Sequence, residues 1–291
     1  MTALSKKMTV LDVLQSTTAY FKKRKIDSPR LNAEHLLAHA LGRTRMELYL
    51  EFERIPEETE LAPLRELVRR RGEGEPLQHL LGTVEFCGQI FLCDKRAMVP
   101  RPETEELVEL LQSKIENQCQ SGSDKSKILD VGTGSGVIAL SLAKKFPEAQ
   151  VSAVDVSDDA LALARENAAR LGLSERVQFA KSNLFEKIDE RFDIIVANLP
   201  YIAMADRHTL SREVLHDPET ALFAGESGEE LIRALIETAP SRLLPGGLLA
   251  IEIGIGQSAG LIGLLTQKNY HDICPKNDYS GVTRFLFAQY G

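Results

Sequence analysis

The chain has little of what marks secreted, zinc-binding or membrane-spanning proteins. Its 291 residues include only 4 cysteines, and no two of them form a C-x-x-C pair. This spacing predicts neither a zinc site nor a disulfide framework, so reduced thiols in a cytosolic protein are expected. No apolar run approaches the roughly 18 residues of a membrane span, and the first residues lack the apolar stretch of a signal peptide. We therefore expect a cytoplasmic protein without a membrane partner.

Positively charged residues are outnumbered by negatively charged ones. Asp and Glu number 42 against 35 Lys and Arg, which gives a net charge of −7. This balance argues against a broad electrostatic grip on nucleic acid, and no direct sequence-specific contact with nucleic acid is expected. Two basic runs, Lys22–Lys25 and Arg69–Arg71, are interpreted as solvated helix ends, with a contact surface for a partner as the alternative.

The N-terminal part of the chain predicts a small helical domain. Residues 1–75 have apolar side chains at helical spacing and several helix-start signals. Capping boxes begin at Thr9 and Thr44, Ser28 is the expected N-cap before a proline, and Pro63 is expected to interrupt the helix or start a turn. A helical bundle of this size has a marginal core by itself. We therefore expect residues 1–75 to pack on something else.

The rest of the chain predicts an α/β domain. Residues 76–100 are β-prone around a glycine and predict a β-hairpin connector, and residues 101–291 form the expected catalytic domain, with a polar loop at 117–127. Strands and helices alternate there, which is typical of a mostly parallel, Rossmann-like sheet. We expect strands at 127–130, 150–155, 177–180, 192–198 and 248–253, helices at 135–145, 158–171, 228–239 and 257–268, and an antiparallel hairpin near 270–273 and 284–288.

A glycine-rich turn follows the first of these strands. In Asp130–Gly136 the glycines lie two apart, which differs from the G-x-G-x-x-G spacing of dinucleotide sites. Asp155 closes the next strand, where an acid binds the hydroxyls of a ribose. This combination favours S-adenosylmethionine over NAD. Asn183 and Leu184 follow the third strand and could hold an adenine edge, although a plain turn is an equal alternative.

The tetrapeptide Asn198-Leu199-Pro200-Tyr201 follows the fourth strand. It lies where the carboxyl ends of parallel strands bind ligands. The Asn198 side chain and the Leu199 carbonyl can each accept an N–H bond, and Tyr201 can stack on a planar group. These groups suit a flat amide or amino nitrogen that is to be oriented for attack.

Several segments together resemble the release factor glutamine N5-methyltransferases, PrmC/HemK-like protein methyltransferases. The resemblance covers nearly the whole chain. Its most specific segment is the Arg-Pro-Glu-Thr-Glu run at 101–105, and the other matching segments are 75–82, 130–136, 198–201, 245–247, 251–254 and 278–284. The implied fold is a class I S-adenosylmethionine-dependent methyltransferase plus a small N-terminal helical domain.

The resemblance implies a reaction and its residues. The family methylates the side-chain amide nitrogen of the glutamine in the Gly-Gly-Gln motif of peptide chain release factors, leaving S-adenosyl-L-homocysteine. Asn198, Leu199, Pro200 and Tyr201 would bind the glutamine and form the catalytic turn. The helical domain would dock the release factor, the enzyme would act as a monomer, and no metal is expected. The implied cofactor-binding residues are Gly132, Thr133, Gly134, Ser135, Gly136, Asp155, Asn183, Leu184 and Asn198.

Two departures from the family pattern leave alternatives open. Leu199 replaces a proline and gives the Asn-Leu-Pro-Tyr form that is common in ribosomal RNA adenine dimethyltransferases. At Asn183 and Leu184 many relatives carry an acid followed by an aromatic residue. One alternative is therefore an adenine N6-methyltransferase acting on RNA or DNA, against which the acidic charge and the 101–105 segment argue. The other is a binding module that has lost catalysis, against which Asn198, Tyr201 and Asp155 argue.

Overall fold

The structure is a computed structural model that describes residues 7–119 and 126–291, and it contains two compact units. One unit comprises the residues up to Gly82 together with 211–216, and the other comprises 83–210 and 217–291. The expected boundary at residue 75 therefore lies inside the first unit, because helix α5 (Leu77–Leu81) places Leu80 in that unit's core. The expected loop at 117–127 is helical as far as Cys119, and its residues 120–125 lie outside the described ones.

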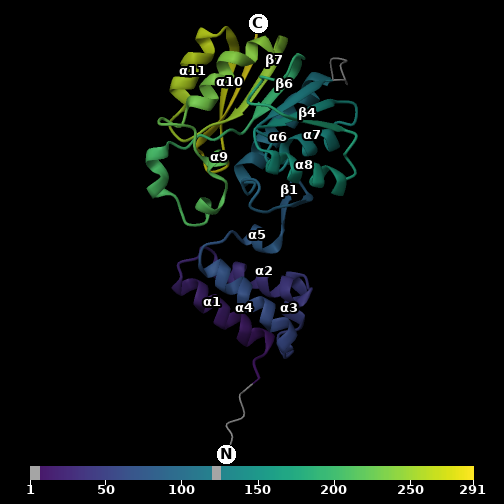
Figure 1. Ribbon diagram of the computed structural model, residues 1–291, viewed down its shortest axis with the longest axis vertical. Coiled ribbons are helices and arrows are strands. Elements are labelled where there is room, and N and C mark those ends of the chain that lie inside the picture. Colours follow the sequence, from purple (N-terminus) through teal and green to yellow (C-terminus); the bar gives the residue numbers. More distant parts are fainter. Residues whose placement is uncertain (1–6, 120–125) are drawn as a thin grey trace, which may run out of the picture. The chain divides into compact units, whose positions relative to one another are not determined.

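The first unit is helical, as predicted (Figure 1). The capping boxes at Thr9 and Thr44 are confirmed, with the side chains of Asp12 and Glu47 accepting the N-cap amides. Its other helices are α1 (Val10–Lys23), α2 (Pro29–Leu41), α3 (Arg45–Leu50) and α4 (Glu58–Gly72). They enclose a core that includes Val10, Leu14, Phe21, Leu36, Leu37 and Leu48.

Two local predictions in this unit are wrong. Pro63 neither interrupts a helix nor starts a turn, since it lies inside α4. A proline removes one N–H from the helix, and the capping box between Glu57 and Glu60 still secures the first turn. Ser28 makes no side-chain cap because it adopts a left-handed conformation. The Asn32 side chain instead donates to the Ser28 carbonyl.

The basic run at the end of α4 has two different surroundings. Arg69 is exposed and pairs with Glu66 and Glu73, as expected of a solvated helix end. Arg71 is only 3% exposed. Its Nε donates to Asn32 Oδ1 at 2.7 Å, and its second guanidinium nitrogen contacts Glu213 at 2.6 Å. Arg71 thus joins α2, α4 and the 211–216 segment within this unit.

We predict that Arg71→Met destabilises the helical unit by about 3–5 kcal/mol, because the Asn32 amide and the Glu213 carboxylate lose their partner. Arg69→Met is the matched control on the same helix. It should change stability by about 0–1 kcal/mol, since exposed ion pairs contribute little. Hydrogen exchange of the α2 and α4 amides measures both effects, and equal losses of protection in the two variants would contradict this assignment.

The second unit is built on a seven-stranded sheet. The strand order is β5-β4-β3-β6-β7-β9-β8, and all neighbouring pairs are parallel except those that β9 makes with β7 and β8. The five predicted parallel strands and the C-terminal hairpin are confirmed, although β7 begins five residues earlier than expected. The strands are β3 (Lys127–Val131), β4 (Gln150–Asp155), β5 (Val177–Lys181), β6 (Phe192–Ala197), β7 (Leu243–Glu252), β8 (Tyr270–Asn277) and β9 (Thr283–Tyr290).

Helices cover both faces of this sheet because its strands bury side chains on both faces. In β3, Ile128 belongs to one apolar cluster and Leu129 to the other. Helices α6 (Pro102–Cys119), α7 (Val137–Lys145) and α8 (Asp158–Arg170) pack in the first cluster. Helices α10 (Glu230–Thr238) and α11 (Ser258–Gln267) pack in the second, on the opposite side in Figure 1. No helix within residues 7–119 and 126–291 could cross a membrane.

The predicted hairpin precedes this sheet and forms part of the second unit. Strands β1 (Thr83–Phe86) and β2 (Gln89–Leu92) pair around a turn at Cys87 and Gly88. Asn167 of α8 is fully buried and joins this hairpin to the glycine-rich turn. Its Oδ1 accepts the Leu92 amide at 2.6 Å, and its Nδ2 donates to the carbonyls of Leu92 and Ser135. The hairpin thereby holds the glycine-rich turn in place.

Candidate active site

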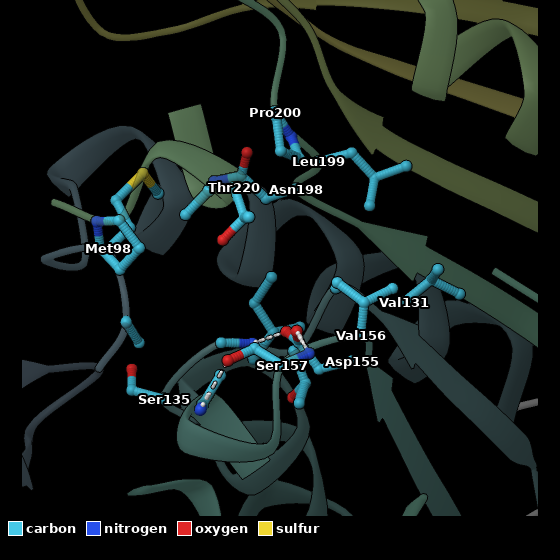
Figure 2. A pocket seen from close by; sticks show the side chains of 18 of the residues that line it. Met98, Val131, Ser135, Asp155, Val156, Ser157, Asn198, Leu199, Pro200 and Thr220 are labelled. Atoms are coloured by element: carbon cyan, nitrogen blue, oxygen red, sulfur yellow. Dashed lines mark hydrogen bonds between the residues drawn. The ribbon is translucent and has the colours of Figure 1, made fainter. Parts of the chain in front are cut away.

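The second unit contains a cavity of about 340 Å³ at the carboxyl ends of its parallel strands. It lies where the chain order reverses between β3 and β6, the usual ligand position in open α/β sheets. In Figure 2, Asp155, Val156 and Ser157 lie on one side of the cavity, and Asn198, Leu199 and Pro200 lie on the opposite side. Among the predicted site residues, those that line it are Gly132, Thr133, Gly134, Ser135, Asp155, Asn183, Leu184, Asn198, Leu199 and Pro200.

Asp155 connects the two loops that follow β3 and β4. Its Oδ2 accepts the Gly134 amide at 2.8 Å, and its Oδ1 accepts the Ser157 amide at 2.9 Å (Figure 2). Gly134 has a φ of +54°, a conformation that favours glycine. A carboxylate has about four acceptor sites, so Asp155 can still accept two hydroxyl groups from a ligand in the cavity. This donor and acceptor pattern fits a ribose.

Asp130 and Gly136 support the glycine-rich turn from behind. Asp130 is buried, accepts the Thr133 hydroxyl at 2.7 Å and accepts the Ala139 amide. Burial raises the pKa of the Asp130 carboxyl to about 7. Gly136 was expected to bind cofactor but does not line the cavity. Gly136 is the N-cap of α7 and has a φ of +84°. A side chain there would press on Leu140 and Ala164, so close packing and the positive φ are the reasons for a glycine at this position.

The loop after β5 contributes the predicted pair, and the loop after β4 contributes a residue that the sequence did not single out. Asn183 lines the cavity while its Nδ2 donates to Glu186. Leu184 lines it with a φ of +47°. Val156 also lines the cavity and is 47% exposed, an unusual state for a β-branched apolar residue. Leu184 and Val156 therefore give this part of the cavity an apolar surface that suits an aromatic base.

The Asn198 side chain begins a chain of hydrogen bonds that runs through Thr104, which also lines the cavity, to the buried Glu252. Its Nδ2 donates to Thr104 Oγ1 at 2.8 Å, and the Thr104 hydroxyl donates to Glu252 Oε2 at 2.8 Å. The Tyr201 hydroxyl donates to the other oxygen of Glu252 at 3.3 Å. Within residues 7–119 and 126–291, no hydrogen bond occupies Asn198 Oδ1. That oxygen is the end of the amide left for a ligand.

Glu252 is the member of this chain that sequence reasoning missed as a site residue. It is 2% exposed, and burial raises the pKa of its carboxyl to about 7 against the hydrogen bonds from Thr104 and Tyr201. Glu103 raises this pKa further, and Arg284 lowers it. A detectable signal existed: Glu252 is the single acid of β7 and follows the apolar run 248–251. Acids are almost never fully buried in proteins without a partner.

Of the two residues Leu199 and Tyr201, only Leu199 lines the cavity. Tyr201 does not line the cavity, and its hydroxyl contacts Glu252, so its expected stacking role stays a prediction. Leu199 is 6% exposed and packs over the glycine-rich turn. A Cβ added to Gly132 would lie 2.7 Å from Leu199 Cδ2. Gly132 therefore provides the space that the Leu199 side chain fills.

An ion pair joins two further walls of the cavity. Arg101 contacts Asp217 at 2.6 Å, and Asp217 also accepts the Val99 amide at 3.1 Å. The neighbouring residues Met98 and Pro218 line the cavity. In the described residues, no group of three His, Cys, Asp or Glu side chains is arranged to hold a metal ion.

Two family models match the chain. The PrmC N-terminal domain matches residues 12–82, and the methyltransferase small domain matches residues 102–229. The first match ends at the boundary of the helical unit, and the second contains most of the cavity residues.

Curated relatives match almost the whole chain. A release factor glutamine methyltransferase of Rhodopirellula baltica is 42% identical, covering 97% of this chain and 96% of the relative. Proteins of the same name from Geobacter sulfurreducens and Vibrio cholerae are 39% and 36% identical, each covering 97% of both chains.

Solved structures show the fold. The hMettl16 catalytic domain in complex with a MAT2A 3′UTR hairpin has a TM-score of 0.55 at 16% identity, covering 81% of this chain and 83% of that one. A T. thermophilus 16S rRNA N2 G1207 methyltransferase in complex with AdoMet and guanosine has a TM-score of 0.51 at 21% identity, covering 72% and 50%. The second unit therefore has the class I methyltransferase fold.

The contact between Leu199 and Gly132 predicts a coupled pair of substitutions. Gly132→Ala should destabilise the protein through its positive φ, by about 1–3 kcal/mol, and through displacement of Leu199. Because Leu199→Ala removes the displaced side chain, the double variant should lose less stability than the sum of the single losses, by about 0.5–3 kcal/mol.

Gly134→Ala is the matched control for this pair. Gly134 also has a positive φ, but a Cβ there meets only Ala97 at 3.9 Å. Its effect should add to that of Leu199→Ala within about 0.3–0.5 kcal/mol. Denaturant unfolding measures all five variants. Additive losses for Gly132→Ala and Leu199→Ala would show that the contact carries no coupling.

Proposed function

This chain belongs to the release factor glutamine methyltransferases, and we propose that the cavity of its second unit carries out their reaction. In that reaction a methyl group passes from S-adenosylmethionine to the side-chain amide nitrogen of the glutamine in the Gly-Gly-Gln motif of a peptide chain release factor. S-adenosyl-L-homocysteine is the second product. The observation that carries the proposal is the Oδ1 of Asn198, a cavity-lining residue directly after β6: within the described residues this oxygen accepts no hydrogen bond.

The cofactor side of the cavity is assigned to the loops after β3, β4 and β5. Asp155 would accept the ribose hydroxyls with the acceptor sites that Gly134 and Ser157 leave free. The glycine-rich turn, Gly132–Ser135, would pass close to the rest of the cofactor. Val156 and Leu184 would enclose the adenine between apolar side chains, and Asn183 would lie at its edge. When bound, S-adenosylmethionine supplies a methyl group already activated by a sulfonium.

The substrate side is assigned to the turn after β6. A glutamine amide has two N–H groups, and the turn offers Asn198 Oδ1 and the Leu199 carbonyl as acceptors. Both bonds would orient the nitrogen lone pair toward the methyl group. They would also strengthen as positive charge develops on nitrogen, which stabilises the transition state more than the ground state. Pro200 would keep the turn rigid, and Tyr201 would secure it through Glu252.

The reaction needs little further chemistry from the protein. The new N–C bond forms as the S–C bond breaks, and the nitrogen becomes acidic only after the transfer. Its proton can then pass to water, so no general base is assigned. Positioning is the main contribution of the site, since a well-oriented pair of reactants can gain as much as about 7–11 kcal/mol.

The remaining assignments concern the protein partner, the oligomeric state and the cellular location of the enzyme. The helical unit would dock the release factor while the second unit holds the glutamine. The enzyme would act as a monomer in the cytoplasm, where release factors function. Transfer to an adenine amino group of RNA or DNA is the competing reaction, because such a group also needs two acceptors. The full-length relatives favour the glutamine substrate.

Asn198→Ala should abolish methyl transfer while S-adenosylmethionine still binds, because the variant loses the amide acceptor and keeps the cofactor loops. Incubation with labelled S-adenosylmethionine and purified release factor measures transfer, and calorimetry measures cofactor affinity. A release factor with glutamic acid in place of the Gly-Gly-Gln glutamine is the substrate control and should receive no label. Parallel incubation with ribosomal RNA tests the competing reaction. Label in RNA alone, or wild-type transfer by Asn198→Ala, would contradict the proposal.

Leu199→Pro should keep methyl transfer, because the carbonyl that accepts the second N–H bond is retained. Leu199 is buried, so the variant should lose stability, by no more than the about 2–5 kcal/mol that a buried Leu→Ala change costs. Thermal unfolding and the release-factor assay test both statements. A folded Leu199→Pro variant without activity would show that this turn is shaped for a different acceptor.

A further inference from the structure

We propose that Thr104 and Glu252 are positioning residues that decide which end of the Asn198 side-chain amide faces the substrate. The inference rests on the proposed function and adds two residues to it. Neither residue needs to touch the glutamine. Both act through Asn198, by the direction in which the hydrogen bonds between Asn198, Thr104 and Glu252 run.

The direction of this chain starts at Glu252. An ionised carboxylate can only accept hydrogen bonds, so the hydroxyl protons of Thr104 and Tyr201 both point to it. Once its proton is used, the Thr104 oxygen can only accept from Asn198. The Asn198 amide must therefore turn its NH₂ group to Thr104 and its oxygen toward the cavity. That is the orientation that accepts an N–H from a glutamine.

The chain is also built to hold one geometry. Thr104 is 3% exposed on α6, Glu252 ends β7, and Asn198 directly follows β6. The three residues therefore come from three separate elements around one buried point. Buried polar groups are costly unless each one is paired, so replacement of any member removes one hydrogen bond from each of its neighbours. A freely rotating amide would present either end to the substrate with similar ease.

A neutral Glu252 would release this constraint. A protonated carboxyl can donate, which frees the Thr104 hydroxyl to donate to the Asn198 oxygen. The amide would then turn its NH₂ group toward the cavity, where it would meet the N–H groups of the glutamine. Two donors facing each other repel, so this orientation is inactive. The active state therefore requires an ionised Glu252.

The charges around Glu252 place its ionisation near neutral pH. Thr104 and Glu103 face it from α6, Tyr201 from the turn after β6, and Arg284 from β9. Burial and Glu103 raise the carboxyl pKa to about 7, against the two hydrogen bonds and Arg284. Because the charged form is the active one, kcat should fall as the pH drops through about 7.

Three variants test this role with saturating S-adenosylmethionine and varied release factor. Thr104→Val keeps the shape and removes the hydroxyl, Glu252→Gln keeps the shape and removes the charge, and Thr104→Ser restores the hydroxyl. We expect the first two variants to lower kcat by about 10- to 100-fold, which is the loss of rate expected when a reacting group is misplaced. Cofactor affinity should be unchanged, and Thr104→Ser should recover most of the rate. Glu252→Gln should also lose the fall in kcat near pH 7.

Glu109→Gln is the control, since Glu109 is exposed on the same helix α6 and contacts Tyr279 there. It should keep both the wild-type kcat and the wild-type pH profile. The role is overturned if Thr104→Val has wild-type kcat, if Thr104→Ser is as impaired as Thr104→Val, or if the fall in kcat persists in Glu252→Gln. If Thr104→Val does not fold, the serine variant and the pH profile of Glu252→Gln still decide.

The same experiment separates this inference from the proposed function. If the wild-type protein places no label on the release factor, the proposed function fails whatever the variants do. If the wild-type protein labels the release factor and the variants behave like it, only the positioning role fails.

Discussion

The constraint on which the active site depends is that the buried carboxylate of Glu252 can accept hydrogen bonds but cannot donate them. Its two oxygens take the hydroxyl protons of Thr104 and Tyr201. Helix α6 and the turn after β6 are thereby joined to β7 at one point, and Asn198 donates its Nδ2 to Thr104, which leaves its oxygen for a ligand. In the proposed reaction, the orientation of the substrate amide thus depends on a carboxylate that lies behind the site.

The cavity as a whole has two sides with different physical requirements. The proposed cofactor side has backbone amides, positive-φ glycines and Asp155, which suit a ligand with hydroxyl groups that needs close approach and acceptors. The proposed substrate side offers acceptors, because an amide nitrogen presents only donors. Leu199 packs over Gly132 and so connects the two sides.

The protonation state of Glu252 also affects the stability of the fold. Because burial raises the pKa of this carboxyl, Glu252 contributes most to stability while it is protonated, and that contribution is lost as the pH rises through about 7. Function and stability therefore favour opposite states of this residue.

Much of the fold and part of the site could be predicted from local patterns. Strand periodicity located β3 to β6, and the glycine-rich turn with Asp155 indicated the cofactor, because these signals lie within short stretches of sequence. The pairing of Glu252 with Thr104 could not be predicted, since it joins residues 148 positions apart. Pro63 was misjudged because the capping of α4 outweighs one lost hydrogen bond. The 211–216 segment was placed with the wrong unit, because Arg71 and Glu213 are 142 positions apart.

The most direct measurement is a crystal structure of the protein with S-adenosyl-L-homocysteine and a release factor that carries the Gly-Gly-Gln motif. The account predicts that the glutamine amide nitrogen lies about 2.7–3.2 Å from both Asn198 Oδ1 and the Leu199 carbonyl. It also predicts that Asn198 Nδ2 remains on Thr104 while Thr104 remains on Glu252. A glutamine bound elsewhere in the cavity, or an Asn198 amide whose oxygen faces Thr104, would contradict the account.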